Sequence, residues 1–101
     1  MTERVQFSKR ATKDIERFDR GVRDRIRAAL AGLVGSPMRP NLDIRPLAGR
    51  SPWLRLRGGS TRVILRQLSL AELRALGRKP PAYLVERIID RRDLDDAVRP
   101  L

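Results

Sequence analysis

The stretch WLRLRGGSTRVILR, residues 53–66, decides the fold of this chain. Apolar residues alternate with arginines on either side of a Gly-Gly-Ser-Thr segment, which predicts two antiparallel strands, residues 53–57 and 62–68, joined by a four-residue loop. That register pairs residues 57 with 62, 56 with 63, 54 with 65 and 53 with 66. One face of the hairpin is then apolar and carries Leu54, Leu56, Val63 and Leu65.

The opposite face of the predicted hairpin carries the charge. Its residues are Trp53, Arg55, Arg57, Arg62, Ile64 and Arg66. From residue 44 to residue 71 the chain has six arginines and neither Asp nor Glu, so this segment supplies six of the eleven net positive charges. Like charges that face each other on a sheet repel, so the facing pair Arg57 and Arg62 needs a counter-charge.

Two sources of that negative charge remain open. One is internal and consists of acids near the C-terminus, namely Asp90, Asp93, Asp95 and Asp96. The other is a bound phosphate, which the forked guanidinium of arginine holds better than an ammonium group does. Trp53 also has two possible roles: a packed cation–π partner of Arg66, which we favour, or an exposed ring that stacks on a base.

Composition limits the class of protein. A chain of 101 residues with 41% hydrophobic and 35% charged residues indicates one globular domain, residues 1–101, and its formal charge of +11 indicates an anionic partner. Codon bias would explain 20 Arg against three Lys, but not the local lack of acids. Without Cys or His, we expect neither metal nor cofactor. No apolar run suits a leader or a membrane span, so we expect a cytoplasmic protein without membrane association.

The segments around the hairpin predict a two-layer domain. A short strand over residues 4–7 runs into a helix capped by Ser8, and two apolar stripes, at residues 11–18 and 22–33, predict an antiparallel pair of helices. A Gly-Ser-Pro turn at residues 35–37 ends the second helix, residues 44–47 form a short strand and residues 83–89 the last strand. Residues 69–82 are an inserted loop with one or two helical turns, and the acidic segment after residue 90 opens a short terminal helix.

The expected class is therefore α+β. An N-terminal strand and a helical hairpin pack on an antiparallel β-sheet meander, followed by a short C-terminal helix. The helical residues expected to pack on the apolar face of the hairpin are Ile15, Phe18, Val22, Ile26, Leu30 and Leu33.

The order and spacing of these segments resemble the RelE/ParE-type toxins of bacterial type II toxin–antitoxin systems. The matching segments are FSKRATKDIERF, VRDRIRAALAGLVGSP, LAGRSPWLRLRGGSTRVIL and IIDRR, and they cover nearly the whole chain apart from residues 69–81. The resemblance implies a RelE-like fold and a cognate antitoxin. An acidic or amphipathic segment of that antitoxin would cover the arginine face or the helical hairpin.

For the ribonuclease branch, the resemblance implies an mRNA interferase that cleaves messenger RNA on the ribosome and so stops translation and growth. The 2′-hydroxyl attacks the neighbouring phosphate without a metal. By position, Arg62 matches the phosphate-binding arginine of the family, Arg55 matches a basic sheet residue, and either Arg91 or Arg92 matches the basic residue that ends the last strand. The residues expected to bind RNA around them are Arg45, Arg50, Arg57, Arg66 and Trp53.

The chain departs from the family pattern after the last strand. Active ribonuclease members often have His, Tyr or Lys there, whereas this segment reads DRRDLDDAVRPL. Arginine is a poor base, so proton transfer would fall to Asp90, Asp93, Asp95 or Glu86. Two alternatives therefore stay open: a ParE-like inhibitor of DNA gyrase without a nuclease site, and a protein that binds RNA without cutting it.

Overall fold

The computed structural model describes residues 4–35 and 38–101, so most of the turn predicted at residues 35–37 lies outside the described residues. The strands are β1 (Val5–Phe7), β2 (Ile44–Pro46), β3 (Leu54–Gly58), β4 (Thr61–Gln67) and β5 (Tyr83–Asp90). The helices are α1 (Lys9–Glu16), α2 (Arg20–Leu33), α3 (Leu70–Leu76) and α4 (Leu94–Val98), with a 3-10 turn, η1 (Arg91–Asp93), before α4.

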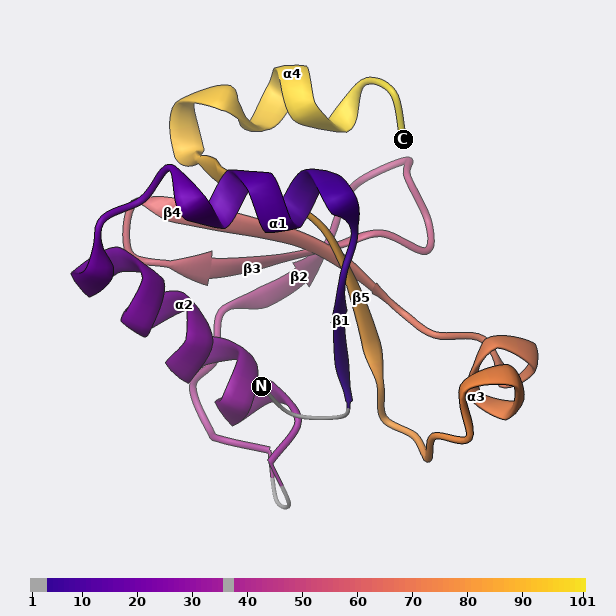
Figure 1. Ribbon diagram of the computed structural model, residues 1–101. Helices are drawn as coiled ribbons and strands as arrows, with labels where there is room; N and C mark the ends of the chain where they lie inside the picture. Colours follow the sequence, from indigo (N-terminus) through magenta and orange to yellow (C-terminus); the bar gives the residue numbers. More distant parts are fainter. Residues whose placement is uncertain (1–3, 36–37) are drawn as a thin grey trace.

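The strands form one mixed sheet in the order β1-β5-β4-β3-β2 (Figure 1). Strands β2 to β5 make the predicted antiparallel meander, while β1 adds to the edge of β5 in the parallel direction. Helices α1 and α2 connect β1, at one edge of the sheet, to β2, at the opposite edge. The predicted α+β class is confirmed.

The hairpin has the predicted register but a tighter turn. Leu54 pairs with Leu65 and Arg57 with Arg62, and the ladder continues to a further pair, Gly58 with Thr61. The loop therefore has two residues rather than the four that we expected. Gly59 opens this turn at φ +65°, a conformation that glycine adopts without a steric penalty.

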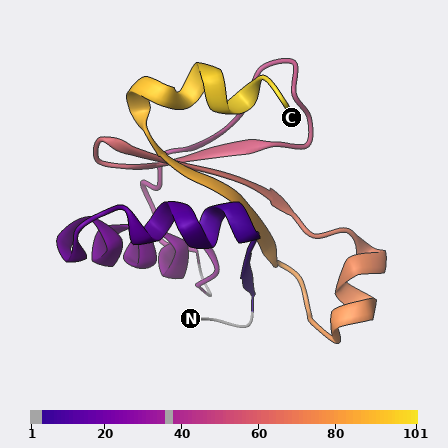
Figure 2. The same cartoon turned by 45° about the horizontal axis from the view of Figure 1, so that its top comes forward.

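Helices α1 and α2 cover one face of the sheet and α4 lies over the other (Figure 2). Ser8 and Asp19 cap α1 and α2 by accepting main-chain N–H bonds from Ala11 and Val22. The main core joins these helices to the apolar face of the hairpin, as predicted. Buried in it are Ile15, Ile26, Leu30, Leu33, Leu56, Val63 and Leu65, with Phe18, Val22 and Leu54 partly buried against them.

A second, smaller apolar cluster lies under α4. Ile64 is completely buried there with Ile89 and Ala97, and Trp53 is partly buried against them. The arginine face is therefore not open over its whole length. Its arginines surround a patch that α4 covers.

The insertion between β4 and β5 contains α3, which projects from the end of the sheet (Figure 1). Ser69 and Glu72 form a capping box at its start, and Leu73 anchors it on Leu68 and Ala82. Among the described residues, no helix has the length and apolar character needed to cross a membrane.

Candidate functional site

Arg62 stands at the start of β4, beside the hairpin turn. Its Nη1 donates to the main-chain oxygens of Gly59, at 2.8 Å, and Thr61, at 3.0 Å. Within residues 4–35 and 38–101, no carboxylate forms an ion pair with it. Partial burial, and then the charges of Arg57, Arg55 and Arg91, lower the pKa of Arg62. We call Arg55, Arg57, Arg62 and Arg91 the tip cluster.

Arg91 and Arg92, between which the sequence could not choose, have different surroundings in the structure. The main-chain N–H of Arg91 donates to the main-chain oxygen of Ser60 at 2.9 Å. This bond fixes the start of η1 against the hairpin turn. Arg92 instead turns to Asp90, with its Nε 3.3 Å from the carboxylate. A hydrogen bond from the main-chain N–H of Arg92, followed by the charges of both arginines, holds the pKa of Asp90 below its usual value despite partial desolvation. Arg91 therefore belongs to the tip cluster and Arg92 does not.

One carboxylate, that of Asp43 in the loop before β2, lies against the tip cluster. Its oxygens are 3.4 Å from Nε of Arg45, 3.5 Å from Nη2 of Arg55 and 3.8 Å from Nη1 of Arg57. Partial desolvation acts to raise the pKa of Asp43, but the charges and hydrogen bonds of Arg55 and Arg45 outweigh it, and the pKa is lowered. The acid that balances these arginines thus stands one residue before the acid-free segment.

The sequence left two sources of counter-charge open, and of the acids near the C-terminus, Asp95 and Asp96 do not supply it. Helix α4 lays Ala97 and Val98 on the sheet, and Asp95 and Asp96 consequently point into solvent. Asp96 is 3.4 Å from Arg99 on its own helix. The geometry of α4 removes these carboxylates from the arginines because its apolar side must face the sheet.

Arg66, at the far end of β4, has a full set of partners. It donates to both carboxylate oxygens of Glu72, at 2.8 and 3.0 Å, and its guanidinium carbon lies 5.8 Å from the ring centre of Trp53. The hydrogen bond to Glu72 raises the pKa of Arg66, and that bond together with the Ser69 N–H lowers the pKa of Glu72 to about 2. The cation–π prediction is confirmed. The Arg66–Glu72 pair anchors α3 to β4, and Arg66 also covers Trp53.

The remaining arginines predicted to bind RNA are dispersed. Arg50 ties the loop between β2 and β3 to the end of the chain, since its Nη1 donates to the main-chain oxygens of Arg99, at 3.3 Å, and Leu101, at 3.5 Å. Arg45 is 73% exposed and contacts Asp43. The structure brings Arg55, Arg57, Arg62 and Arg91 together, with Arg45 at their border, and places Arg50, Arg66, Arg92 and Trp53 elsewhere.

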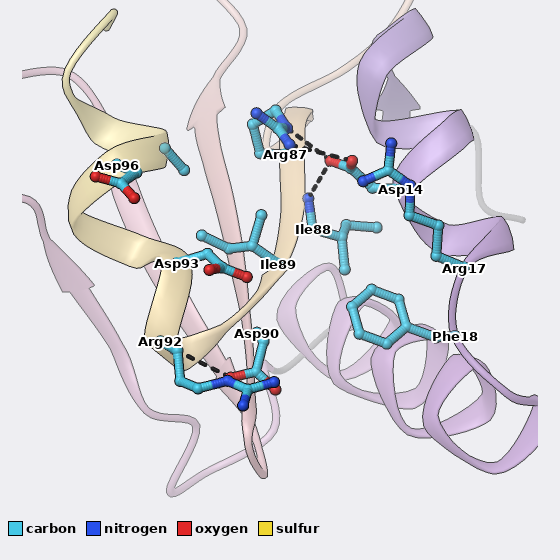
Figure 3. A pocket seen from close by; sticks show the side chains of 11 residues that line it. Asp14, Arg17, Phe18, Arg87, Ile88, Ile89, Asp90, Arg92, Asp93 and Asp96 are labelled. Carbon is cyan, nitrogen blue, oxygen red and sulfur yellow. Dashed lines mark hydrogen bonds and ion pairs between the residues drawn. The ribbon is translucent and has the colours of Figure 1, made fainter.

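A cavity of about 520 Å³ lies between α1, β5 and α4 (Figure 3). On its floor, the buried carboxylate of Asp14 accepts hydrogen bonds from Nε of Arg87, at 2.7 Å, and from the main-chain N–H of Ile88, at 2.9 Å. The bond to Asp14 raises the pKa of Arg87. This pair was not predicted from the sequence, although an acid at position 14 falls within the apolar stripe of α1 and so indicates a buried partner. Of the predicted site arginines, Arg92 lines this cavity, together with Asp90 and Asp93, two of the candidates for proton transfer.

Among the described residues, the carboxylate that contacts the tip cluster is that of Asp43, and its lowered pKa makes it a poor proton acceptor. Tyr83 is buried and pairs with Gln67, at the opposite end of the β4–β5 ladder from Thr61 and Asp90. Asp90 pairs with Thr61 at the end of the ladder, and both Asp90 and Asp93 line the cavity. Within the described part of the chain, no group of three or more His, Cys, Asp or Glu residues could hold a metal ion. The tip cluster can therefore bind and stabilise an anion, but it offers little for proton transfer.

The comparisons with known proteins give a fold. No protein-family model matches the sequence, and no curated protein matches it. A chain of the RelB–RelE antitoxin–toxin complex from Methanococcus jannaschii matches with a TM-score of 0.65 and 19% identity, over 91% of this chain and 96% of that one. A chain of the archaeal RelE–RelB complex from Pyrococcus horikoshii OT3 matches with a TM-score of 0.62 and 20% identity, over 90% and 97%. Both neighbours are archaeal, whereas the resemblance named a bacterial family. The fold of this chain is the RelE-type fold.

Proposed function

We propose that this protein is the toxin of a toxin–antitoxin pair, that residues 1–101 act as one toxin domain in the cytoplasm, and that it cleaves messenger RNA on the ribosome. The RelE-type fold supports the toxin assignment, because the matched structures are antitoxin–toxin complexes. The observation that carries the nuclease proposal is Arg62, which stands among three other arginines with no carboxylate of the described residues paired to it.

The proposed reaction requires positive charge more than any other feature. When the 2′-oxygen attacks the adjacent phosphorus and loses its proton, the P–O5′ bond breaks and the 5′-oxygen leaves and takes up a proton. The pentavalent phosphorane between these two events carries more negative charge than the substrate did. Arg62 contacts the scissile phosphate, and Arg91 adds to the positive field around it. Fixed donors of this kind stabilise the charge that develops in the transition state without reorganisation.

Proton transfer is the weak part of this active site. A positioned acid or base typically contributes about 10²- to 10⁴-fold in rate. The carboxylate of Asp90 has a lowered pKa, which makes it a poor proton acceptor. We therefore expect a slow nuclease whose catalysis rests mainly on charge stabilisation.

The formal charge of +11 fits two kinds of partner. One is the ribosome with its messenger RNA, whose phosphates attract a basic protein over long distances. The other is a cognate antitoxin with an acidic or amphipathic segment. That segment would cover the tip cluster, or the outer surface of α1 and α2, and so keep the toxin inactive.

A ParE-like inhibitor of DNA gyrase is the second candidate. The observation that favours it is the position of Tyr83, which is buried and remote from the tip cluster. A protein that binds RNA without cutting it is the third candidate, since the tip cluster can hold phosphate without proton transfer.

One experiment separates these candidates. Purified protein is incubated with ribosomes programmed with a short messenger RNA, alongside the same RNA carrying a 2′-deoxy nucleotide at the cleaved position. The proposal expects slow cleavage of the first RNA and none of the second, because the nucleophile is missing. Intact RNA in both reactions, together with DNA breaks and filamentation on induced expression, would select the gyrase inhibitor.

A further inference from the structure

Asp43 makes an uneven contribution to the tip cluster. Its carboxylate contacts Arg55 and Arg57, whereas Arg62 and Arg91 receive no ion pair from it. The backbone of Asp43 is held in place, since the main-chain N–H of Arg57 donates to the main-chain oxygen of Asp43 at 2.9 Å. Within the described part of the chain, the cluster is thereby divided into Arg55 and Arg57, which have an ion-pair partner, and Arg62 and Arg91, which have none.

The donor atoms that Asp43 occupies are those a phosphate would use. Its oxygens lie 3.5 Å from Nη2 of Arg55 and 3.8 Å from Nη1 of Arg57. A carboxylate and a phosphate bind the guanidinium fork in the same way, so they compete for it. The side chain of Asp43 is 33% exposed and that of Arg57 is 53% exposed, and an ion pair so close to solvent is weak. An RNA strand can therefore meet this carboxylate at the surface.

We propose that Asp43 is an internal competitor of RNA: it occupies Arg55 and Arg57 and so leaves one phosphate position, at Arg62 and Arg91, open to the substrate. This inference rests on the proposed function and assigns the specificity of the same site. Four arginines without an ion-pair partner would bind several phosphates of any RNA. With Asp43 in place, binding to free RNA stays weak and the cluster acts on a single phosphate that the ribosome presents.

The test uses the full chain and a short fluorescent single-stranded RNA without ribosomes. Binding is measured by anisotropy over a series of salt concentrations for the wild type, Asp43→Asn, Asp43→Glu and Asp95→Asn. Asp95 is exposed on α4 and forms no ion pair among the described residues. Asp95→Asn therefore removes the same charge as Asp43→Asn, but at a position outside the tip cluster.

Asp43→Asn should bind the RNA more tightly and with a steeper salt dependence. Each additional phosphate contact adds roughly 0.7 to the slope of log K against log salt, which is about fivefold in affinity near 0.1 M salt. Asp43→Glu should keep the wild-type slope because it keeps the charge, and Asp95→Asn should match the wild type.

Other results overturn the inference. If Asp43→Asn binds no more tightly than Asp95→Asn, Asp43 only holds the loop in place and has no effect on RNA. If neither Asp43→Asn nor Asp43→Ser folds, as judged by thermal melting, Asp43 is a structural counter-ion and the proposal is wrong. If the wild type binds no RNA at any salt concentration, the proposed function fails as well, whereas binding without cleavage leaves the inference intact and rejects only the nuclease.

Discussion

Arg62 and Arg66 lie four residues apart on the same face of β4, but their surroundings are opposite. Arg66 donates to both oxygens of Glu72 and lies over Trp53, and the hydrogen bond raises its pKa. In the described part of the chain, Arg62 donates only to main-chain oxygens, and partial burial with three neighbouring arginines lowers its pKa. The difference shows that an arginine-rich strand can anchor a helix at one end and remain available to an anion at the other.

Both ends depend on the apolar face beneath them. Leu56 is completely buried in the main core, so Leu56→Asp should unfold the domain and abolish the difference between the two ends altogether. Burying an unpaired carboxylate costs several kcal/mol, on the order of the whole stability of a domain. Circular dichroism and thermal melting check this. Leu70→Asp is the control, because Leu70 is 68% exposed and the same change there should leave the fold intact.

Arg87 is a second arginine with a carboxylate partner, and it can be compared with Arg66. Arg87 is paired with Asp14, whose side chain is only 4% exposed. Asp14→Ala leaves a partly buried guanidinium and the buried Ile88 N–H without their acceptor, and should cost about 3–5 kcal/mol of unfolding free energy in urea. Asp24→Ala, at an exposed position on α2, is the control. Equal stability of the two variants would mean that the Asp14 pair does not hold α1 on β5.

Arg66→Ala should affect stability and leave the chemistry in place. The change removes the anchor between β4 and α3 and the contact with Trp53, so the melting temperature should fall by a few degrees. Cleavage below that temperature should stay close to the wild-type rate. Arg74→Ala, on the exposed side of α3, is the control and should do neither. A large loss of cleavage in folded Arg66→Ala would extend the phosphate site along the whole strand.

The smallest effect is a pH dependence at the Arg66 end. The folded state lowers the pKa of Glu72 to about 2 from 4.5, so its contribution to stability is complete above pH 4.5 and is lost as the pH falls towards 2. Glu72→Gln should therefore melt below the wild type at pH 7, and the two should converge between pH 4.5 and pH 2. A difference that persists unchanged at pH 2 would show that packing, not charge, stabilises α3.

The hairpin and the core were predictable because they follow from short-range periodicity. Alternation around Gly59 determined the register, and a one-residue shift would have moved Leu56 to the wrong face. The turn came out shorter than predicted because the glycine pair allows a tighter turn than side-chain alternation alone indicates.

The partners of the arginines were not predictable in the same way. The acid-free segment runs from residue 44 to residue 71, and the two acids that pair with four of its six arginines, Asp43 and Glu72, directly flank it. Whether a flanking acid contacts an arginine of the sheet depends on the conformation of the loop before β2, for Asp43, and of the start of α3, for Glu72. These conformations depend on tertiary structure. For the same reason the sequence could not choose between Arg91 and Arg92, since the choice depends on how η1 meets the turn at Ser60.

The central claim is that Arg62 contacts the scissile phosphate, and its most direct test is single-turnover cleavage of messenger RNA on saturating ribosomes. Arg62→Ala should lose on the order of a hundredfold in rate, roughly 3 kcal/mol of transition-state stabilisation, while ribosome binding falls far less. Arg62→Lys should recover part of the rate. Arg45→Ala removes the same charge from a residue that is 73% exposed on β2, and should cleave like the wild type. If Arg62→Ala and Arg45→Ala lose cleavage equally, and only in proportion to lost binding, Arg62 has no chemical role and the nuclease proposal is wrong.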